Sequence, residues 1–157
     1  MNGPDNGVYT LIYCSRNRLQ GSPAEVRREL QDILAAARRN NARLEVTGSL
    51  LYNAGSFAQI LEGPPDSIQR IFETIQRDAR HGEVTVIRSE YAPERQFPNW
   101  SMAFAGGSSF EGAPDATDAF EAVFAGAASG GEQMLTLLHD LMVDESEWLL
   151  METATTA

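Results

Sequence analysis

The sequence contains no lysine and only one cysteine, Cys14, so no intrachain disulfide can form within its 157 residues. A single thiol fits a reducing compartment, and we therefore expect a cytoplasmic protein. No stretch approaches the roughly 18 consecutive apolar residues that a membrane-spanning helix needs. Residues 1–7 also lack the basic and then apolar pattern of a secretion signal. With 43% hydrophobic and 22% charged residues, the composition predicts a globular chain without a membrane partner.

Basic residues are missing from the last part of the chain. All twelve are arginines within residues 1–95, whereas the charged residues of segment 96–157 are all acidic. The net charge of the whole chain is −10. An acidic tail repels phosphate backbones, so we expect no nucleic-acid partner. We interpret the tail most simply as the solvated surface of helices.

Motifs for metal or phosphate chemistry are also missing. The two histidines, His81 and His139, lie far apart without a cysteine-rich or carboxylate cluster, so we expect no metal site. No glycine-rich phosphate loop of the P-loop or Rossmann kind is present. Glu62 has no second carboxylate at a useful spacing, and we interpret it as a solvated residue at a strand edge.

Alternating and helical apolar spacings predict the order βαββαβ, followed by one more strand. Right-handed crossovers would place both helices on one face of an antiparallel sheet, which is a ferredoxin-like α+β sandwich with an added fifth strand. Two short helical patterns follow a segment rich in Gly, Ser and Pro, and we expect them to cover the other face. The expected strands are 8–14, 43–52, 56–63, 84–90 and 100–104, the expected helices 23–40 and 64–79, and the boundary segment 106–114.

Three polar residues occupy positions where the pattern predicts core. Gln59 shares a strand face with Phe57 and Leu61, Tyr13 continues an apolar face of the first strand, and Asn41 extends the helical stripe of Ile33. A buried amide group left without a partner costs about 1–3 kcal/mol, so these groups need partners. They could satisfy one another, or they could hold a flat ring whose edge alternates C=O and N–H groups. The spacing leaves both interpretations open.

Five segments resemble one known family. They are LIYCSRN (11–17), NNARLEVTGSLLY (40–52), FAQILEG (57–63), QRDARH (76–81) and FPNWSM (97–102). In order and at compatible spacing, over essentially all of residues 8–105, they are similar to the BLUF domain, a blue-light sensor that uses flavin. The resemblance implies FAD as a non-covalent cofactor, with FMN or riboflavin as alternatives.

The resemblance also implies roles for the polar residues. Tyr13 would donate an electron and a proton to the excited flavin, and Gln59 would bridge Tyr13 and the N5/O4 edge. Asn41 would hold the O4/N3 edge. Arg80 would lie near O2 and His81 beside the ring.

Further positions match the family in the same way. Ile33 and Ile75 would enclose the ring from the two helices, and Trp100 and Met102 would relay the signal near Gln59. Asn40 stands where some members have histidine. For the diphosphate of FAD, Arg16, Arg18, Arg39 and the start of the second helix are all open as partners.

We therefore expect residues 1–105 to be a flavin-binding photosensor domain and residues 106–157 to be a C-terminal helical cap. Without an enzymatic output domain, the chain would not be an enzyme. It would signal through the fifth strand and the tail helices to an unknown protein partner, or by a change in a homo-oligomer. The main alternative is a light-insensitive, small-ligand-binding regulatory domain of ferredoxin-like fold. An acylphosphatase-like enzyme would need a glycine-bearing loop after the first strand, and an RNA-recognition domain would need a basic surface.

Overall fold

The computed structural model describes residues 7–53, 56–98, 103–105, 116–126, 131–134 and 136. They form eight elements: β1 (Val8–Asn17), α1 (Pro23–Arg43), β2 (Thr47–Asn53), β3 (Ser56–Gly63), α2 (Pro65–Arg77), β4 (His81–Ala92), β5 (Ala103–Ala105) and α3 (Ala116–Phe124). Trp100 and Met102 lie outside the described residues. Among the described residues, no helix is long and apolar enough to cross a membrane.

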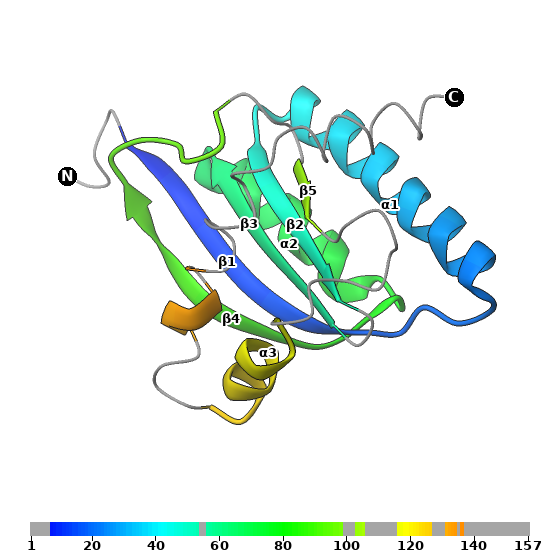
Figure 1. The fold of residues 1–157 in the computed structure, drawn as a ribbon. Helices are drawn as coiled ribbons and strands as arrows, with labels where there is room; N and C mark the ends of the chain where they lie inside the picture. The colour runs from blue at the N-terminus through cyan, green and yellow to red at the C-terminus, as the bar shows by residue number, and fades with distance from the viewer. Residues whose placement is uncertain are drawn as a thin grey trace.

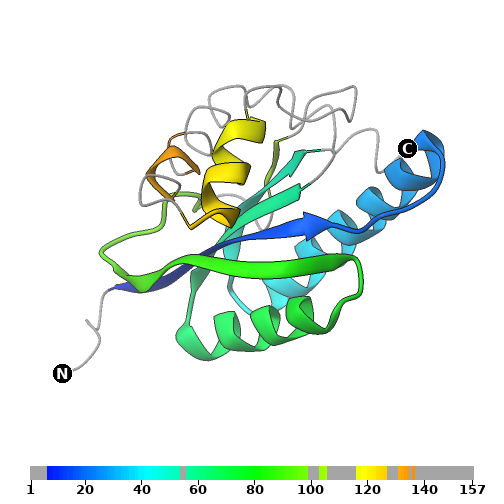
Figure 2. The ribbon, with the colours of Figure 1, turned by 90° about the horizontal axis from the view of Figure 1, so that it is seen from below.

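The strands form one sheet in the order β4-β1-β3-β2-β5 (Figure 1). The first four strands pair antiparallel, and β5 runs parallel to β2 at the other edge. Helices α1 and α2 lie on one face of this sheet, and α3 lies on the opposite face (Figure 2). The ferredoxin-like α+β sandwich with an added strand is therefore confirmed.

The main core fills the space between the sheet and the two helices. Leu30 and Leu34 of α1 and Ile68 of α2 supply the helical side. They pack against the sheet residues Leu11, Leu50, Tyr52, Phe57 and Leu61 and against Val46 just before β2, all of them buried. Every residue of β3 is buried, because this strand lies in the middle of the sheet between β1 and β2. Gln59 therefore lies in the best-covered strand of the fold.

Local sequence signals set the start of α1 but not its end. The Ser22 side chain accepts a hydrogen bond from the Glu25 backbone, and the Glu25 side chain accepts one in return, a capping box before Pro23. We expected the helix to end near residue 40 and the next strand to begin at residue 43. The helix instead runs to Arg43, and β2 begins only at Thr47. Glu45 takes a left-handed φ of 61° at this connection, which the alternation pattern does not reveal.

The outer strands are longer than the sequence pattern predicts. β1 continues through Asn17, and β4 begins at His81 instead of residue 84. Their ends pair directly, with Asn17 opposite His81. This pairing brings the segment after α2 back against β1.

Helix α3 contacts the face of the sheet opposite α1 and α2 through aromatic and ionic interactions. The Arg16 guanidinium lies 3.9 Å from the centre of the Phe124 ring and 3.3 Å from the Glu121 carboxylate. In the same region Arg88 of β4 pairs with Glu132 at 3.1 Å. Glu121 and Glu132, two acidic residues of the C-terminal part, thus pair with arginines of residues 1–95 while their side chains stay exposed to solvent.

Candidate functional site

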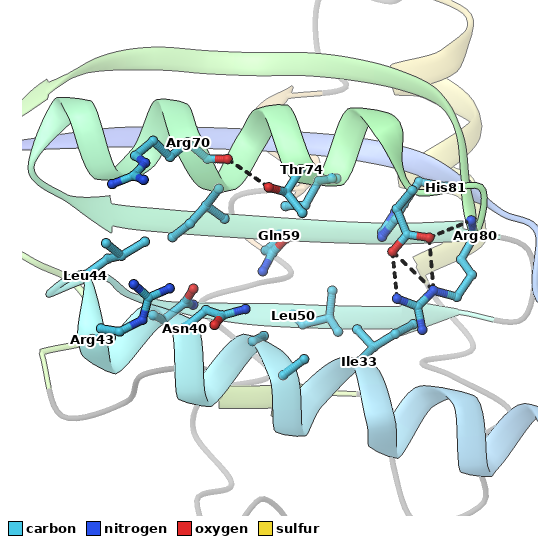
Figure 3. Close-up of a pocket in the computed structure, with 16 residues that line it drawn as sticks. Ile33, Asn40, Arg43, Leu44, Leu50, Gln59, Arg70, Thr74, Arg80 and His81 are labelled. Atoms are coloured by element: carbon cyan, nitrogen blue, oxygen red, sulfur yellow. Dashed lines mark hydrogen bonds and ion pairs between the residues drawn. The ribbon is translucent and has the colours of Figure 1, made fainter.

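A cavity of about 280 Å³ lies between α1 and α2, above the sheet (Figure 3). One wall comes from α1, the other from α2, and Leu50 and Gln59 rise from the strands below. The segment after α2 closes one end. The lining residues are Ile33, Ala36, Ala37, Asn40, Asn41, Arg43, Leu44, Leu50, Gln59, Arg70, Ile71, Thr74, Ile75, Asp78, Arg80 and His81.

Tyr13 and Gln59 lie opposite each other in the β1–β3 pair. The Tyr13 hydroxyl donates a hydrogen bond to Oε1 of Gln59. Tyr13 is fully covered, with 0% of its surface exposed, whereas Gln59 at 5% reaches the cavity. The carboxamide therefore stands between the buried phenol and the cavity.

The Tyr13 phenol is held in its protonated form. Burial raises its pKa well above the usual value, and the nearby Cys14 and Asp78 raise it further. The ring also contacts Phe72 of α2, with ring centres 5.5 Å apart. A neutral phenol donates a hydrogen bond, so this environment favours an orientation of Gln59 in which its oxygen faces Tyr13.

Asn41 enters the cavity from the last turns of α1. Only 1% of its surface is exposed. Its backbone oxygen accepts hydrogen bonds from the amides of Leu44, at 3.1 Å, and Val46, at 2.8 Å. These bonds fix the end of the helix, so the Asn41 side chain is presented from a rigid position. Gln59 and Asn41 together give the cavity two buried carboxamides.

Asp78, Arg80 and His81 close the end of the cavity after α2. Arg80 binds Asp78 through two nitrogens, with Nη2 2.7 Å from Oδ2, and lies 3.9 Å from Glu29 of α1. This pairing lowers the pKa of Asp78 and raises that of Arg80. The cation at this end is therefore already balanced by carboxylates.

His81 is a neutral imidazole in this environment. Its Nδ1 lies 2.8 Å from the hydroxyl of the buried Ser15, and its ring centre lies 4.9 Å from that of Phe57. Burial lowers the pKa of His81 to about 4, Asp78 opposes this shift, and Arg80 adds to it. His81 can thus act as a polar wall of the cavity without adding charge at neutral pH.

Six of the residues singled out from the sequence meet around this one cavity. Ile33 and Asn41 come from α1, Gln59 from β3, and Ile75, Arg80 and His81 from α2 and the segment after it. Tyr13 joins them through Gln59. Trp100 and Met102, expected to relay a signal, lie outside the described residues.

The arginines considered for a diphosphate do not line the cavity. Arg16 binds Glu83, at 3.0 Å, and Glu121 near α3. Arg18 packs over Gly82, so closely that a Cβ at this glycine would lie 2.0 Å from its Nε. Arg39 is exposed on α1.

Four polar residues of the cavity were not predicted from the sequence: Arg43, Arg70, Thr74 and Asp78. Helical spacing could have found two of them. Arg43 lies three residues after Asn40 on α1, and Arg70 lies four before Thr74 on α2, so each shares a helix face with another lining residue.

The interpretation of Glu62 as a solvated strand-edge residue is wrong. Its side chain is completely buried and accepts hydrogen bonds from the backbone amides of Gln96, at 2.6 Å, and Phe97, at 2.9 Å. Burial raises the pKa of Glu62 although these bonds, Thr47 and Arg95 oppose the shift. The carboxyl group thus attaches the chain after β4 to the end of β3, three residues beyond Gln59.

No group of three or more His, Cys, Asp or Glu residues within the described ranges has the arrangement of a metal site. Of the ionisable residues that line the cavity, Asp78 and Arg80 form a compact ion pair. The cavity therefore offers two buried carboxamides, a neutral imidazole and arginine side chains between apolar walls, and the Tyr13 phenol lies behind Gln59.

The sequence model of one family matches residues 8–103; its description is "BLUF: Sensors of blue-light using FAD". Among solved structures, the dark-state structure of BlrB, a BLUF protein, has a TM-score of 0.69 and 30% sequence identity, covering 89% of this chain and 98% of that one. The photo-activated state of BlsA gives a TM-score of 0.67 at 25% identity, covering 87% and 95%.

Curated relatives contain the same region within longer proteins. The blue light- and temperature-regulated antirepressor BluF of Escherichia coli K12 is 36% identical over 93 residues, which are 59% of this chain and 22% of that protein. The photoactivated adenylate cyclase subunit beta of Euglena longa is 36% identical over 102 residues, 64% and 11% of the two chains. The chain thus spans between a tenth and a quarter of these relatives.

Proposed function

Because the chain belongs to the BLUF family of blue-light sensors that use flavin, we propose that it is a photoreceptor that binds FAD non-covalently in the cavity between α1 and α2. It has no enzymatic activity of its own and passes the light signal to a protein partner in the cytoplasm. The single observation that carries the proposal is the hydrogen bond from the fully buried Tyr13 to Gln59 at the cavity.

The chemistry of the cavity fits a flavin ring. Ile33 of α1 and Ile75 of α2 provide apolar walls for its two faces. Gln59 and Asn41 each offer a donor and an acceptor, which suits a ring edge of alternating carbonyl and ring-nitrogen groups.

Arg80 and His81 would complete the site at the end after α2. Arg80 is held by Asp78, so it can offer its remaining N–H groups to a carbonyl oxygen without bringing an unbalanced charge. His81 is neutral and contacts the aromatic core through Phe57. The two residues therefore add polarity and shape to the site, but no net charge.

A bound flavin supplies the absorption of blue light and an excited state that accepts an electron. Tyr13 is the aromatic side chain joined by a hydrogen bond to the cavity, so it is the electron donor in this proposal. Loss of an electron would make the phenol strongly acidic, and its proton would pass through its hydrogen bond to Gln59 toward the flavin that took the electron. The Gln59 amide then rearranges, which exchanges the donor and acceptor that it presents to Tyr13 and to the cavity.

The rearranged amide would act on the far side of the sheet through the chain after β4. Glu62 binds the backbone at Gln96 and Phe97, just before the expected relay residues Trp100 and Met102. The signal would then reach β5 and the C-terminal residues 106–157, which we propose to be a helical cap on the sensor domain formed by residues 1–105. It would leave by contact with a partner or by a change in a homo-oligomer.

Absorption spectroscopy of the purified protein tests this function. We expect a flavin band in darkness that moves a few nanometres to the red after a blue flash and returns in the dark. Extraction and chromatography would identify the bound flavin, which we expect to be FAD. A protein that stays colourless with added flavin would contradict the proposal and favour a light-insensitive regulatory domain that binds another small ligand.

A further inference from the structure

The two ends of the cavity differ in how their arginines are balanced. At one end, Arg80 is paired with Asp78 and lies near Glu29. At the other end, Arg43 of α1 and Arg70 of α2 line the cavity from opposite helices (Figure 3). Neither forms an ion pair with any residue that the structure describes. Two exposed positive charges thus remain at one end of a cavity whose other polar groups are satisfied or neutral.

The positions of these arginines suit a bound anion. Arg43 lies in the last turn of α1 and Arg70 in the second turn of α2, and both are exposed to solvent. Guanidinium groups bind phosphate oxygens through paired N–H donors, and two of them can bind one phosphate from two sides. Asp66 and Glu73 lie one helical turn from Arg70 on α2, but neither forms an ion pair with it.

We propose that Arg43 and Arg70 bind the phosphate that distinguishes the flavin nucleotides FMN and FAD from riboflavin. This inference rests on the proposed function, since it assumes that a flavin ring lies between Ile33 and Ile75. With the polar edge of the ring directed at Gln59 and Asn41, the side chain of the flavin leaves by the open side of the cavity. The first phosphate, which FMN and FAD share, then meets the unbalanced arginines.

The arginines that were first considered for the diphosphate are poorer partners for a phosphate at this cavity. Arg16 is engaged with Glu83, Glu121 and the ring of Phe124 near the opposite face of the sheet. Arg18 is packed on Gly82 and does not line the cavity. Arg39 and Arg77 are exposed on α1 and α2 without lining the cavity, so they provide matched controls on the same two helices.

The experiment compares riboflavin with FMN as ligands of the full chain freed of bound flavin, with flavin fluorescence as the readout. We expect FMN to bind at least about tenfold more tightly than riboflavin at low salt, as a charge-assisted contact predicts. In the double variant Arg43→Gln/Arg70→Gln this preference should fall to about onefold to twofold, with the affinity for riboflavin unchanged. The retained riboflavin affinity would show that the variant is folded.

The control variant Arg39→Gln/Arg77→Gln removes the same net charge and should keep the preference for FMN. The inference is overturned if the wild-type chain binds both flavins equally, if the double variant keeps the full preference, or if the control loses it as well. Failure of the proposed function has a different signature, because neither riboflavin nor FMN would then bind to any of the proteins.

Discussion

Tyr13 and Gln59 are direct partners across the β1–β3 pair, and the Tyr13 hydroxyl donates a hydrogen bond to Oε1 of Gln59. The phenol is completely buried, whereas the amide also lines the cavity. Any change in the orientation of this amide therefore alters a contact on both of its sides. In the proposed function this amide is therefore a local switch that needs the movement of only a few atoms.

Filling the cavity should prevent flavin binding without unfolding the protein. Ala37 lines the cavity on the α1 side, and a phenylalanine there would occupy the space of the ring. We expect Ala37→Phe to bind flavin at least about a hundredfold more weakly while its stability stays within about 1.5 kcal/mol of wild type. Flavin titration and urea unfolding measure the two effects. Ala42→Phe, at an exposed position on the same helix, should bind flavin normally.

The stability of the flavin-free chain should fall on acidification because of His81. Its pKa is about 4 in the folded chain against an ordinary value of 6.5, so the unfolded chain binds a proton first. The contribution of His81 to the free energy of unfolding is complete above pH 6.5. It is lost as the pH falls towards 4, and the loss is on the order of 3 kcal/mol.

The variant His81→Gln isolates this effect. Urea unfolding at several pH values should give a wild-type curve that falls more steeply than the variant curve between pH 6.5 and 4. Parallel curves for the two proteins would contradict the account. The slopes outside this window should be the same, because the other titrating groups are unchanged.

Removal of the Glu62 carboxylate should destabilise the fold although the residue lies outside the cavity. In Glu62→Ala, the backbone amides of Gln96 and Phe97 lose their acceptor. We expect the free energy of unfolding to fall by about 3 kcal/mol, because each unsatisfied buried donor costs about 1–3 kcal/mol. Urea unfolding measures the loss. Glu94→Ala, at an exposed position two residues before Gln96, should change the stability by less than about 0.5 kcal/mol.

We predict that the attachment of α3 depends on Phe120, which is 1% exposed. We expect Phe120→Ala to release α3, because loss of a buried phenylalanine costs about 3–5 kcal/mol. Hydrogen exchange should then become at least about tenfold faster in α3 while the amides of β1 and β3 stay protected. Equal protection of α3 in wild type and variant would mean that other contacts hold this helix. Ala125→Ser, at an exposed position just after α3, serves as the control.

Local patterns in the sequence were sufficient to predict the order of helices and strands along the chain and the central polar residues. Alternation in β1 and β3 put Tyr13 and Gln59 on the same face, and helical spacing added Asn41. Each of these inferences uses a period that neighbouring residues repeat, so short stretches carry the information. The family resemblance then suggested one ligand for all three residues, and their flavin contacts stay a prediction.

The features that were missed depend on partners distant in the chain. The buried Glu62 side chain accepts hydrogen bonds from backbone amides 34 and 35 residues later in the chain. Because every residue except proline has a backbone N–H group, such donors cannot be recognised from the sequence. Arg43 was assigned to an expected strand. The left-handed turn that follows the helix lies at Glu45, and without a glycine at this position the sequence does not indicate the turn. With the helix extended to Arg43, the same periodicity would have placed this residue beside the cavity.

The most direct test of the central claim is the light-minus-dark absorption spectrum of three flavin-loaded variants beside the wild type. We expect the reversible red shift to disappear in Gln59→Leu and in Tyr13→Phe. It should persist in Tyr9→Phe, which lies on the same face of β1 but whose hydroxyl bonds Ser89, away from the cavity. A normal red shift in Gln59→Leu would contradict the account, because the amide would then not be the group that responds to light.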